Sequence, residues 1–184
     1  MIKVFEKILL VLVMFGTIFG NLSCDRADNS RKTPSVDDKQ RKESVEEANR
    51  NLVKLEREII DEYVKHSGLD FVETGTGLRY CIENQGEGDL IKQGGIVSMD
   101  YEMWLLNGEM LYNSTNDGLM TFMVGRGGVE SGLEEAVLHL HKGDLATIVI
   151  PSHLAHGLIG DGKRVPPRST LVYKVKIIEY QINK

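Results

Sequence analysis

The sequence predicts an α+β domain, in which an antiparallel β-sheet of about five strands packs on one short helix, with an amphipathic helix in front. Three observations predict this class. Apolar side chains recur every three or four positions in residues 44–68, and from residue 75 onward they alternate with polar ones in short segments. Helical spacing then returns only in residues 129–140. Helix and strand patterns separated in this way indicate a sheet with a helix on one face.

Length and charge limit the range of functions. The 184 residues suffice for one domain with appendages. The chain carries 22 lysines and arginines against 27 aspartates and glutamates, a net charge of −5. It contains no basic block longer than two residues, which a nucleic-acid-binding surface would need. We therefore expect no nucleic-acid partner.

The first 23 residues have the layout of a secretory signal peptide. Lys3 and Lys7 give a basic start, and the continuous apolar run Ile8–Phe19 follows, with small residues near its end. The run is shorter than the ~20 apolar residues that a spanning helix needs. We expect a signal peptide over residues 1–23; the alternative is a single anchor helix that is not cleaved.

Residues 20–24, Gly-Asn-Leu-Ser-Cys, resemble a bacterial lipobox, in which a small residue precedes a cysteine that is lipidated. Ser23 fits this pattern, whereas Asn21 stands where leucine is usual. The resemblance implies lipidation at Cys24, a lipid anchor in a membrane of the bacterial envelope, and a domain in the periplasm or at the cell surface. The alternative is a soluble secreted protein cut nearby. With Cys24 lipidated, Cys81 has no partner for an internal disulfide, and we expect it in the core.

Residues 24–43 are predicted to be a flexible tether. Between Asp25 and Glu43 only Ala27, Pro34 and Val36 interrupt the polar side chains. Such a segment buries too little apolar surface to fold.

Residues 44–68 are predicted to form the amphipathic helix. Ser44 and Glu47 have the spacing of a capping box, and Gly68 is typical of a helix end. The apolar stripe consists of Val45, Ala48, Leu52, Leu55 and Ile59, widened by Ile60, Tyr63 and Val64. We expect this stripe to pack on the following domain or the helix to serve as a connector. A homodimer seam is the alternative, although the repeat covers barely two heptads.

Residues 75–184 are predicted to form the domain itself. Alternation predicts strands at Leu78–Glu83, Ile96–Leu106, Met110–Asn113, Met120–Val124, Leu145–Ile150 and Thr170–Glu179. Asn107-Gly108 is a tight-turn signal, and Ser114–Gly118 is predicted to be a polar loop. Leu133, Ala136, Val137 and Leu140 form the apolar face of the helix Val129–Leu140.

The stretch Pro151–Val175 carries a resemblance to a known family. Its Ala-His-Gly turn at residues 155–157 and its run Val-Pro-Pro-x-x-Thr-Leu-Val-Tyr at residues 165–173 resemble the signature of the FKBP-type peptidyl-prolyl isomerases. The resemblance extends without gaps from Val97 to Ile178. It implies an FKBP-like fold, in which this stretch forms one wall of a pocket for a proline side chain.

Prolyl isomerisation needs neither a nucleophile nor a metal. Its barrier of ~18–20 kcal/mol arises from amide resonance, and an apolar cavity that holds the ring twisted favours the transition state. The resemblance therefore implies no cofactor, no metal, and prolyl-containing polypeptide clients as partners.

The resemblance also supplies candidate residues, which fall into two groups. Candidate catalytic residues are Tyr101, Glu130 through its backbone N–H, His156 and Tyr173. Candidate substrate-binding residues are Leu111, Tyr112, Met120, Val129, Leu133 and Val165.

Several of these positions depart from the family pattern. Leu133 stands in place of the floor tryptophan, Met120 in place of a wall phenylalanine, and His156 in place of the flap tyrosine. Leu111 and Tyr112 replace a phenylalanine–aspartate pair, which removes a carboxylate. The changes predict a softer apolar pocket with weakened catalysis.

Residues 151–157, Pro-Ser-His-Leu-Ala-His-Gly, also resemble the gliding-motility-associated peptidyl-prolyl isomerases, which are FKBP-like lipoproteins. This implies a role in folding exported envelope proteins. The alternative is an FKBP-like chaperone or assembly module with little isomerase activity. His139, His141, His153 and His156 lack an accompanying carboxylate or cysteine cluster, so we expect surface or turn histidines and no metal site.

Overall fold

The computed structural model describes residues 36–182, with side chains from residue 39 onward. The predicted signal peptide, Cys24 and the first part of the predicted tether lie outside the described residues. Within the described part, no helix combines the length and the apolar character that crossing a bilayer would require. Residues 44–184 form one compact unit, which contains the sheet and its helices.

Helix α2 runs from Val36 to Ser67, so it begins before the predicted start at Ser44. The prediction that residues 36–43 belong to a tether, and that Ser44 caps the helix, is therefore wrong. Residues 39–43 are lysine, glutamine, arginine, lysine and glutamate, all of which have high intrinsic helix propensity. Low apolar content argues against a packed core, but it does not prevent a helix.

The sheet contains seven antiparallel strands among the described residues, in the order β1-β2-β6-β7-β3-β4, with β5 also paired to β3. The strands are β1 Val72–Glu73, β2 Arg79–Asn84, β3 Ile96–Leu105, β4 Met110–Asn113, β5 Met120–Met123, β6 Leu145–Ile150 and β7 Leu171–Gln181. The six predicted strands are all present. The additional strand, β1, has two residues, too few for alternation to predict.

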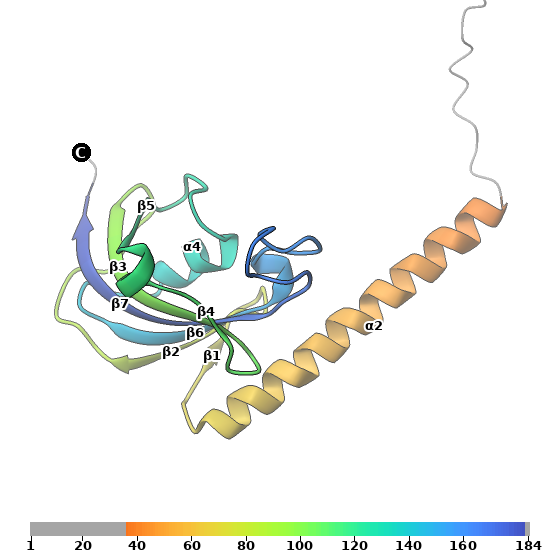
Figure 1. Cartoon of the computed structure of the whole chain (residues 1–184), viewed down its shortest axis with the longest axis horizontal. Helices are drawn as coiled ribbons and strands as arrows, with labels where there is room; N and C mark the ends of the chain where they lie inside the picture. Colours follow the sequence, from red (N-terminus) through yellow and green to blue (C-terminus); the bar gives the residue numbers. More distant parts are fainter. Residues whose placement is uncertain (1–35, 183–184) are drawn as a thin grey trace, which may run out of the picture. The chain divides into compact units, whose positions relative to one another are not determined.

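Helix α4, Ser131–Val137, lies against one side of the curved sheet (Figure 1). The structure confirms the predicted α+β arrangement of an antiparallel sheet with a short helix. Two short helical turns were predicted as loop. The first is α3, Ser114–Asp117, where the Asn113 side chain accepts a hydrogen bond from the N–H of Asn116. The second is a 3-10 turn at Ser152–Leu154.

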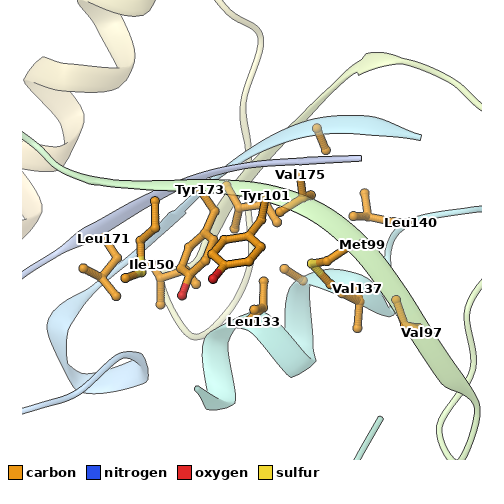
Figure 2. Packing of buried hydrophobic residues seen from close by; sticks show 14 of the residues in the cluster. Val97, Met99, Tyr101, Leu133, Val137, Leu140, Ile150, Leu171, Tyr173 and Val175 are labelled. Carbon is orange, nitrogen blue, oxygen red and sulfur yellow. The ribbon is translucent and has the colours of Figure 1, made fainter. Parts of the chain in front are cut away.

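The main core lies between α4 and the inner face of the sheet (Figure 2). The predicted apolar face of the helix, Leu133, Ala136, Val137 and Leu140, is completely buried. The predicted bounds Val129–Leu140 are too wide, because α4 spans only Ser131–Val137 and Leu140 follows it. Strands β3 and β7 contribute alternate residues, among them Met99, Tyr101, Tyr173 and Val175. Cys81 is a buried free thiol in β2, as predicted.

The apolar stripe of α2 divides into two parts. Ile60 is buried in a second cluster with Val149 and Val172, and Tyr63 and Val64 pack on this cluster. The N-terminal part is instead exposed; it consists of Val45, Leu52, Leu55 and Ile59. Of the two expectations for the stripe, packing on the domain is therefore wrong for these four residues, which leaves this part of the helix as a connector.

Polar contacts fix the same end of α2 to the domain. The Glu56 carboxylate accepts hydrogen bonds from the N–H and hydroxyl of Ser152, at 2.7 and 3.0 Å, and from the hydroxyl of Thr170, at 2.7 Å. One helical turn later, Asp61 accepts a hydrogen bond from the buried Arg79. The helix is thus anchored over Glu56–Val64 by both polar and apolar contacts.

We expect Ile60→Ala to lower the free energy of unfolding by about 2–4 kcal/mol, because it leaves a cavity among packed apolar side chains. The matched control, Val53→Ala, removes a side chain of the same helix that is 57% exposed and should change stability by no more than about 0.5 kcal/mol. Urea unfolding measures both variants. Equal losses would contradict the division of the stripe.

Candidate active site

Two tyrosines form the centre of the candidate site. Tyr101 lies opposite Val175, and Tyr173 opposite Met103, so the antiparallel pairing of β3 and β7 brings both to the same inner face. Their ring centroids are 6.3 Å apart, with an angle of 39° between the ring planes. Figure 2 shows both hydroxyl groups pointing toward the side on which Leu133 of α4 lies.

The floor of the site is closed by packing. Leu133 has no exposed surface, and Tyr173 is 1% exposed. Leu111 and Val165 are also buried. Burial, and then the neighbouring Glu130 carboxylate, raise the pKa of Tyr173 well above its usual value. Burial and then the carboxylates of Asp117 and Glu130 also raise the pKa of Tyr101. Both hydroxyls are therefore protonated, and able to donate, at neutral pH.

The Glu130 side chain joins three elements around this floor. Its Oε1 accepts a hydrogen bond from the hydroxyl of Tyr173, at 2.9 Å, and lies 2.8 Å from Nε2 of His156. Glu130 precedes the first residue of α4, yet its side chain makes no capping hydrogen bond. Sequence reasoning assigned Glu130 a role through its backbone alone and missed this side chain. The signal was available, since His156 and Tyr173, two predicted residues of the same site, carry donors that a carboxylate can bind.

The flap, which we define as Ser152–Thr170, is held to β4 at the rim. The hydroxyl of Tyr112 donates to Oδ2 of Asp161 at 2.5 Å. The guanidinium of Arg164 lies 4.8 Å from the centroid of the Tyr112 ring and donates to the carbonyl of Leu111 at 2.8 Å. Tyr112 therefore connects the strand to the flap.

Asp161 restores a carboxylate to this edge of the site. Tyr112 removes a carboxylate from β4, and Asp161 brings one to the same edge from the flap. Its Oδ1 accepts from the N–H groups of Lys163 and Val165, both at 2.8 Å. Burial raises the pKa of Asp161, but the hydrogen bonds from Tyr112 and the two N–H groups, with the charge of His156, outweigh it and lower the pKa to about 2.

A tight turn inside the flap keeps this geometry. Gly160 has a φ of +70°, and a Cβ atom there would lie 2.1 Å from the carbonyl oxygen of Val165. Only glycine fits such a position without displacing backbone. The turn places Asp161 opposite Val165, whose N–H donates to the Asp161 carboxylate. Val165 is one of the predicted substrate-binding residues.

The remaining predicted residues lie at the rim. Met120 and Val129 are partly buried against the main core, together with Tyr112. The N–H of Glu130 makes no hydrogen bond within residues 39–182, and neither does the hydroxyl of Tyr101. The structure thus brings the predicted site residues together around one buried floor. Two donors at this floor are available to a ligand.

The other three histidines of the predicted set, His139, His141 and His153, contact different parts of the chain. His139 stacks on Tyr80 with 4.8 Å between ring centroids, and Nε2 of His153 lies 3.2 Å from the carbonyl oxygen of Thr76. Nδ1 of His141 lies 3.6 Å from the buried Asp144. In the part of the chain that the structure describes, no three or more histidine, cysteine or acidic side chains are grouped as metal ligands.

Comparisons with known proteins agree on one family. The sequence model described as FKBP-type peptidyl-prolyl cis-trans isomerase matches residues 88–178. A protein of Neisseria meningitidis described as a probable FKBP-type peptidyl-prolyl cis-trans isomerase FkpA is 38% identical over 107 residues, which cover 58% of this chain and 39% of that protein. FK506-binding protein 1 of Dictyostelium discoideum is 28% identical over 106 residues, 57% of this chain and 99% of that protein.

Solved structures agree with the sequence comparison. The crystal structure of FkpA from Escherichia coli superposes with a TM-score of 0.62 and 25% sequence identity, over 80% of this chain and 74% of that one. The chain spans less than half the length of the first two curated relatives it matches, 39% and 46% respectively.

We expect Tyr112→Phe to raise the pKa of Asp161 from about 2 toward its ordinary value of 3.8, because the variant removes a hydrogen bond to the charged carboxylate. Since the folded-state pKa lies below the unfolded one, Asp161 stabilises the fold above about pH 4, and this contribution is lost as pH falls toward 2. The variant should therefore lose less stability over that range.

Carboxyl carbon NMR titration reports the pKa, and urea unfolding at several pH values reports the stability. At pH 7 the loss should be about 1 kcal/mol. The control is Tyr63→Phe, since the Tyr63 hydroxyl makes no hydrogen bond among the described residues and lies outside the site. An unchanged Asp161 titration in Tyr112→Phe would refute the contact.

Proposed function

The chain belongs to the family of FKBP-type peptidyl-prolyl cis-trans isomerases, whose model spans residues 88–178, and on this premise we propose that it catalyses prolyl isomerisation in exported polypeptides. The observation that carries the proposal is the pair Tyr101 and Tyr173 over the apolar residue Leu133, with two available donors at the rim of this floor. The reaction requires no group beyond these.

The proposed mechanism uses differential binding. The proline ring lies against the apolar floor near Tyr101, Val165 and the rim residues Met120 and Val129. The N–H of Glu130 holds the carbonyl oxygen of the substrate, and the hydroxyl of Tyr101 is the second donor. Because water is excluded, the twisted amide with reduced C–N double-bond character is favoured over the planar ground state. His156 and Tyr173 act through Glu130, whose side chain they position.

We expect catalysis to be weaker than in family members with a full aromatic set. Leu133 offers less ring contact than the tryptophan it replaces, and Met120 is a flexible side chain. The hydrogen-bonded edge formed by Tyr112 and Asp161 compensates in part, because it holds the flap beside the site.

The proposed location is the bacterial cell envelope. The basic start, the apolar run Ile8–Phe19 and the lipobox-like segment ending in Cys24 support export and lipid anchoring. The clients would be prolyl-containing polypeptides of the envelope, and the anchor would hold the protein at a membrane with its domain in the periplasm or at the cell surface.

A second function is favoured by apolar exposure outside the site. Leu158 and Ile159 in the flap are 69% and 83% exposed, and Leu52 and Leu55 of α2 are exposed as well. Together with Ile59, the α2 residues line a groove of about 460 Å³ that reaches Gly157 and Leu158. Such a surface suits an FKBP-like chaperone that holds unfolded segments with little isomerase activity.

We also propose that α2 supports a homodimer. Val45, Leu52, Leu55 and Ile59 recur at helical spacing and stay exposed within the described unit. Burying this stripe against a second copy would remove the apolar surface that the single chain leaves in water.

The isomerase proposal predicts that the purified protein accelerates a proline-limited refolding reaction. Tyr101→Ala should reduce kcat/KM at least about tenfold, because a wall of the site is lost. Tyr101→Phe should reduce kcat/KM less, because it removes only the stabilisation that one hydrogen bond gives to the transition state. Tyr180→Phe is the control, because the hydroxyl of Tyr180 accepts a hydrogen bond from the N–H of Lys92 and is not among the proposed site residues. A protein that suppresses aggregation without accelerating refolding would establish the chaperone function instead.

The dimer proposal predicts a concentration-dependent dimer in sedimentation velocity. Replacing Leu52 and Ile59 together by aspartate should make the protein monomeric with an unchanged circular dichroism spectrum, because charges at the seam remain unpaired in the dimer. Lys54→Ala, on the exposed face of the same helix, should have no effect. A wild-type protein that is monomeric at every concentration would exclude the dimer.

A further inference from the structure

The Glu130 carboxylate is a charged group inside an otherwise apolar site. Its side chain is 9% exposed, so the charge is mostly withdrawn from water and needs compensation from neighbouring donors. Compensation is unequal between the two oxygens. Oε1 contacts both the hydroxyl of Tyr173 and Nε2 of His156, while Oε2 makes no hydrogen bond within residues 39–182.

Oε2 is open to the surroundings. Among the described residues, the one enclosed side-chain nitrogen or oxygen that lacks a hydrogen bond is Nδ1 of His141. Oε2 of Glu130 also lacks a hydrogen bond among the described residues, and it is not one of these enclosed atoms. The carboxylate is thus fixed through one oxygen and offers the other as an acceptor.

The side chain is directed to this place at the expense of a local alternative. Glu130 is the N-cap residue of α4, where an acidic side chain could accept from the free N–H groups of the first turn. It makes no such bond and extends instead to β7 and the flap. The orientation is therefore set by the site and not by the helix.

From these contacts we propose that Glu130 determines substrate specificity, with Oε2 accepting a hydrogen bond from a lysine or arginine side chain next to the client's proline. The inference rests on the proposed isomerase function. In that function the N–H of Glu130 holds a substrate carbonyl. Because the N–H and the carboxylate belong to the same residue, the cation must come from a residue adjacent to the proline.

Surrounding charges favour a cation. Two further carboxylates lie near the same site. Asp161 interacts electrostatically with His156, and Asp117 interacts with Tyr101. The nearby guanidinium of Arg164 is engaged elsewhere, since it lies over Tyr112 and donates to the carbonyl of Leu111. An acidic residue beside the proline would meet repulsion from Glu130, and a cationic one would complete its contacts.

The test compares tetrapeptides that differ only beside the proline, with lysine, leucine or glutamate before it in one series and after it in another. NMR exchange spectroscopy measures catalysed isomerisation, and chemical-shift titration measures Kd on the same samples. The wild-type protein should prefer lysine to glutamate in one of the series by about fivefold or more in kcat/KM, the size expected of a partly exposed ion pair. Raising the salt concentration should reduce this preference.

Glu130→Gln is the decisive variant. Its amide oxygen can still accept from Tyr173, so the decisive readout is the ratio between lysine and glutamate peptides on the same protein and not the rate with any one peptide. The ratio of lysine to glutamate peptides should fall to about one. Glu102→Gln is the matched control, since it removes the same charge from an exposed position of β3 and should leave the ratio unchanged.

The outcomes separate the two proposals. A wild-type protein that isomerises none of the peptides would refute the isomerase function, while its Kd values would still measure the preference. An active protein with equal rates for lysine and glutamate peptides would overturn the specificity inference alone. A uniform loss across all peptides in Glu130→Gln would also overturn it, because it would indicate a structural role.

Discussion

The pairing of β3 with β7 is the constraint on which the candidate site depends. It is the longest ladder of the sheet, from Ile96 opposite Gln181 to Leu105 opposite Leu171. A slip by one residue would turn every inward side chain outward, so the register is fixed by burial along the whole length. Tyr101 and Tyr173 are therefore placed together by the same apolar contacts that stabilise the domain.

The flap is positioned from two sides by polar contacts. At its ends, Ser152 and Thr170 both donate to Glu56 of α2, and near its middle Asp161 accepts from Tyr112 of β4. Each such bond contributes only ~1 kcal/mol net, so the flap is held in place without being locked. This connects α2 to the site through Glu56, and it explains the Pro-Ser-His segment structurally, since Ser152 and His153 contact α2 and the Thr76 carbonyl.

Sequence reasoning predicted the strands and the helix well because their signal is local. Alternation and helical spacing describe which face of an element is buried, and all four apolar residues predicted for the helix are buried, although α4 ends at Val137. It failed where partners are distant in sequence. Tyr112 replaces a carboxylate, and nothing local to it indicates that Asp161 of the flap supplies one. The exposed stripe of α2 could not be separated from Ile60, because periodicity does not tell which part of a face finds a partner.

The buried floor and the charged rim together suggest how binding and selectivity are divided. Leu133 and Tyr173 have almost no exposed surface, so a proline ring that reaches them must displace the rim residues that cover them. The rim is made of adaptable or hydrogen-bonded parts, namely Met120, Val129, His156 and the flap. Displacing them costs a few weak contacts, which the apolar contact with the ring can offset. Discrimination between clients then depends on groups that stay fixed while the rim moves. Glu130 is such a group, because its carboxylate is held by Tyr173, which is itself buried in the main core.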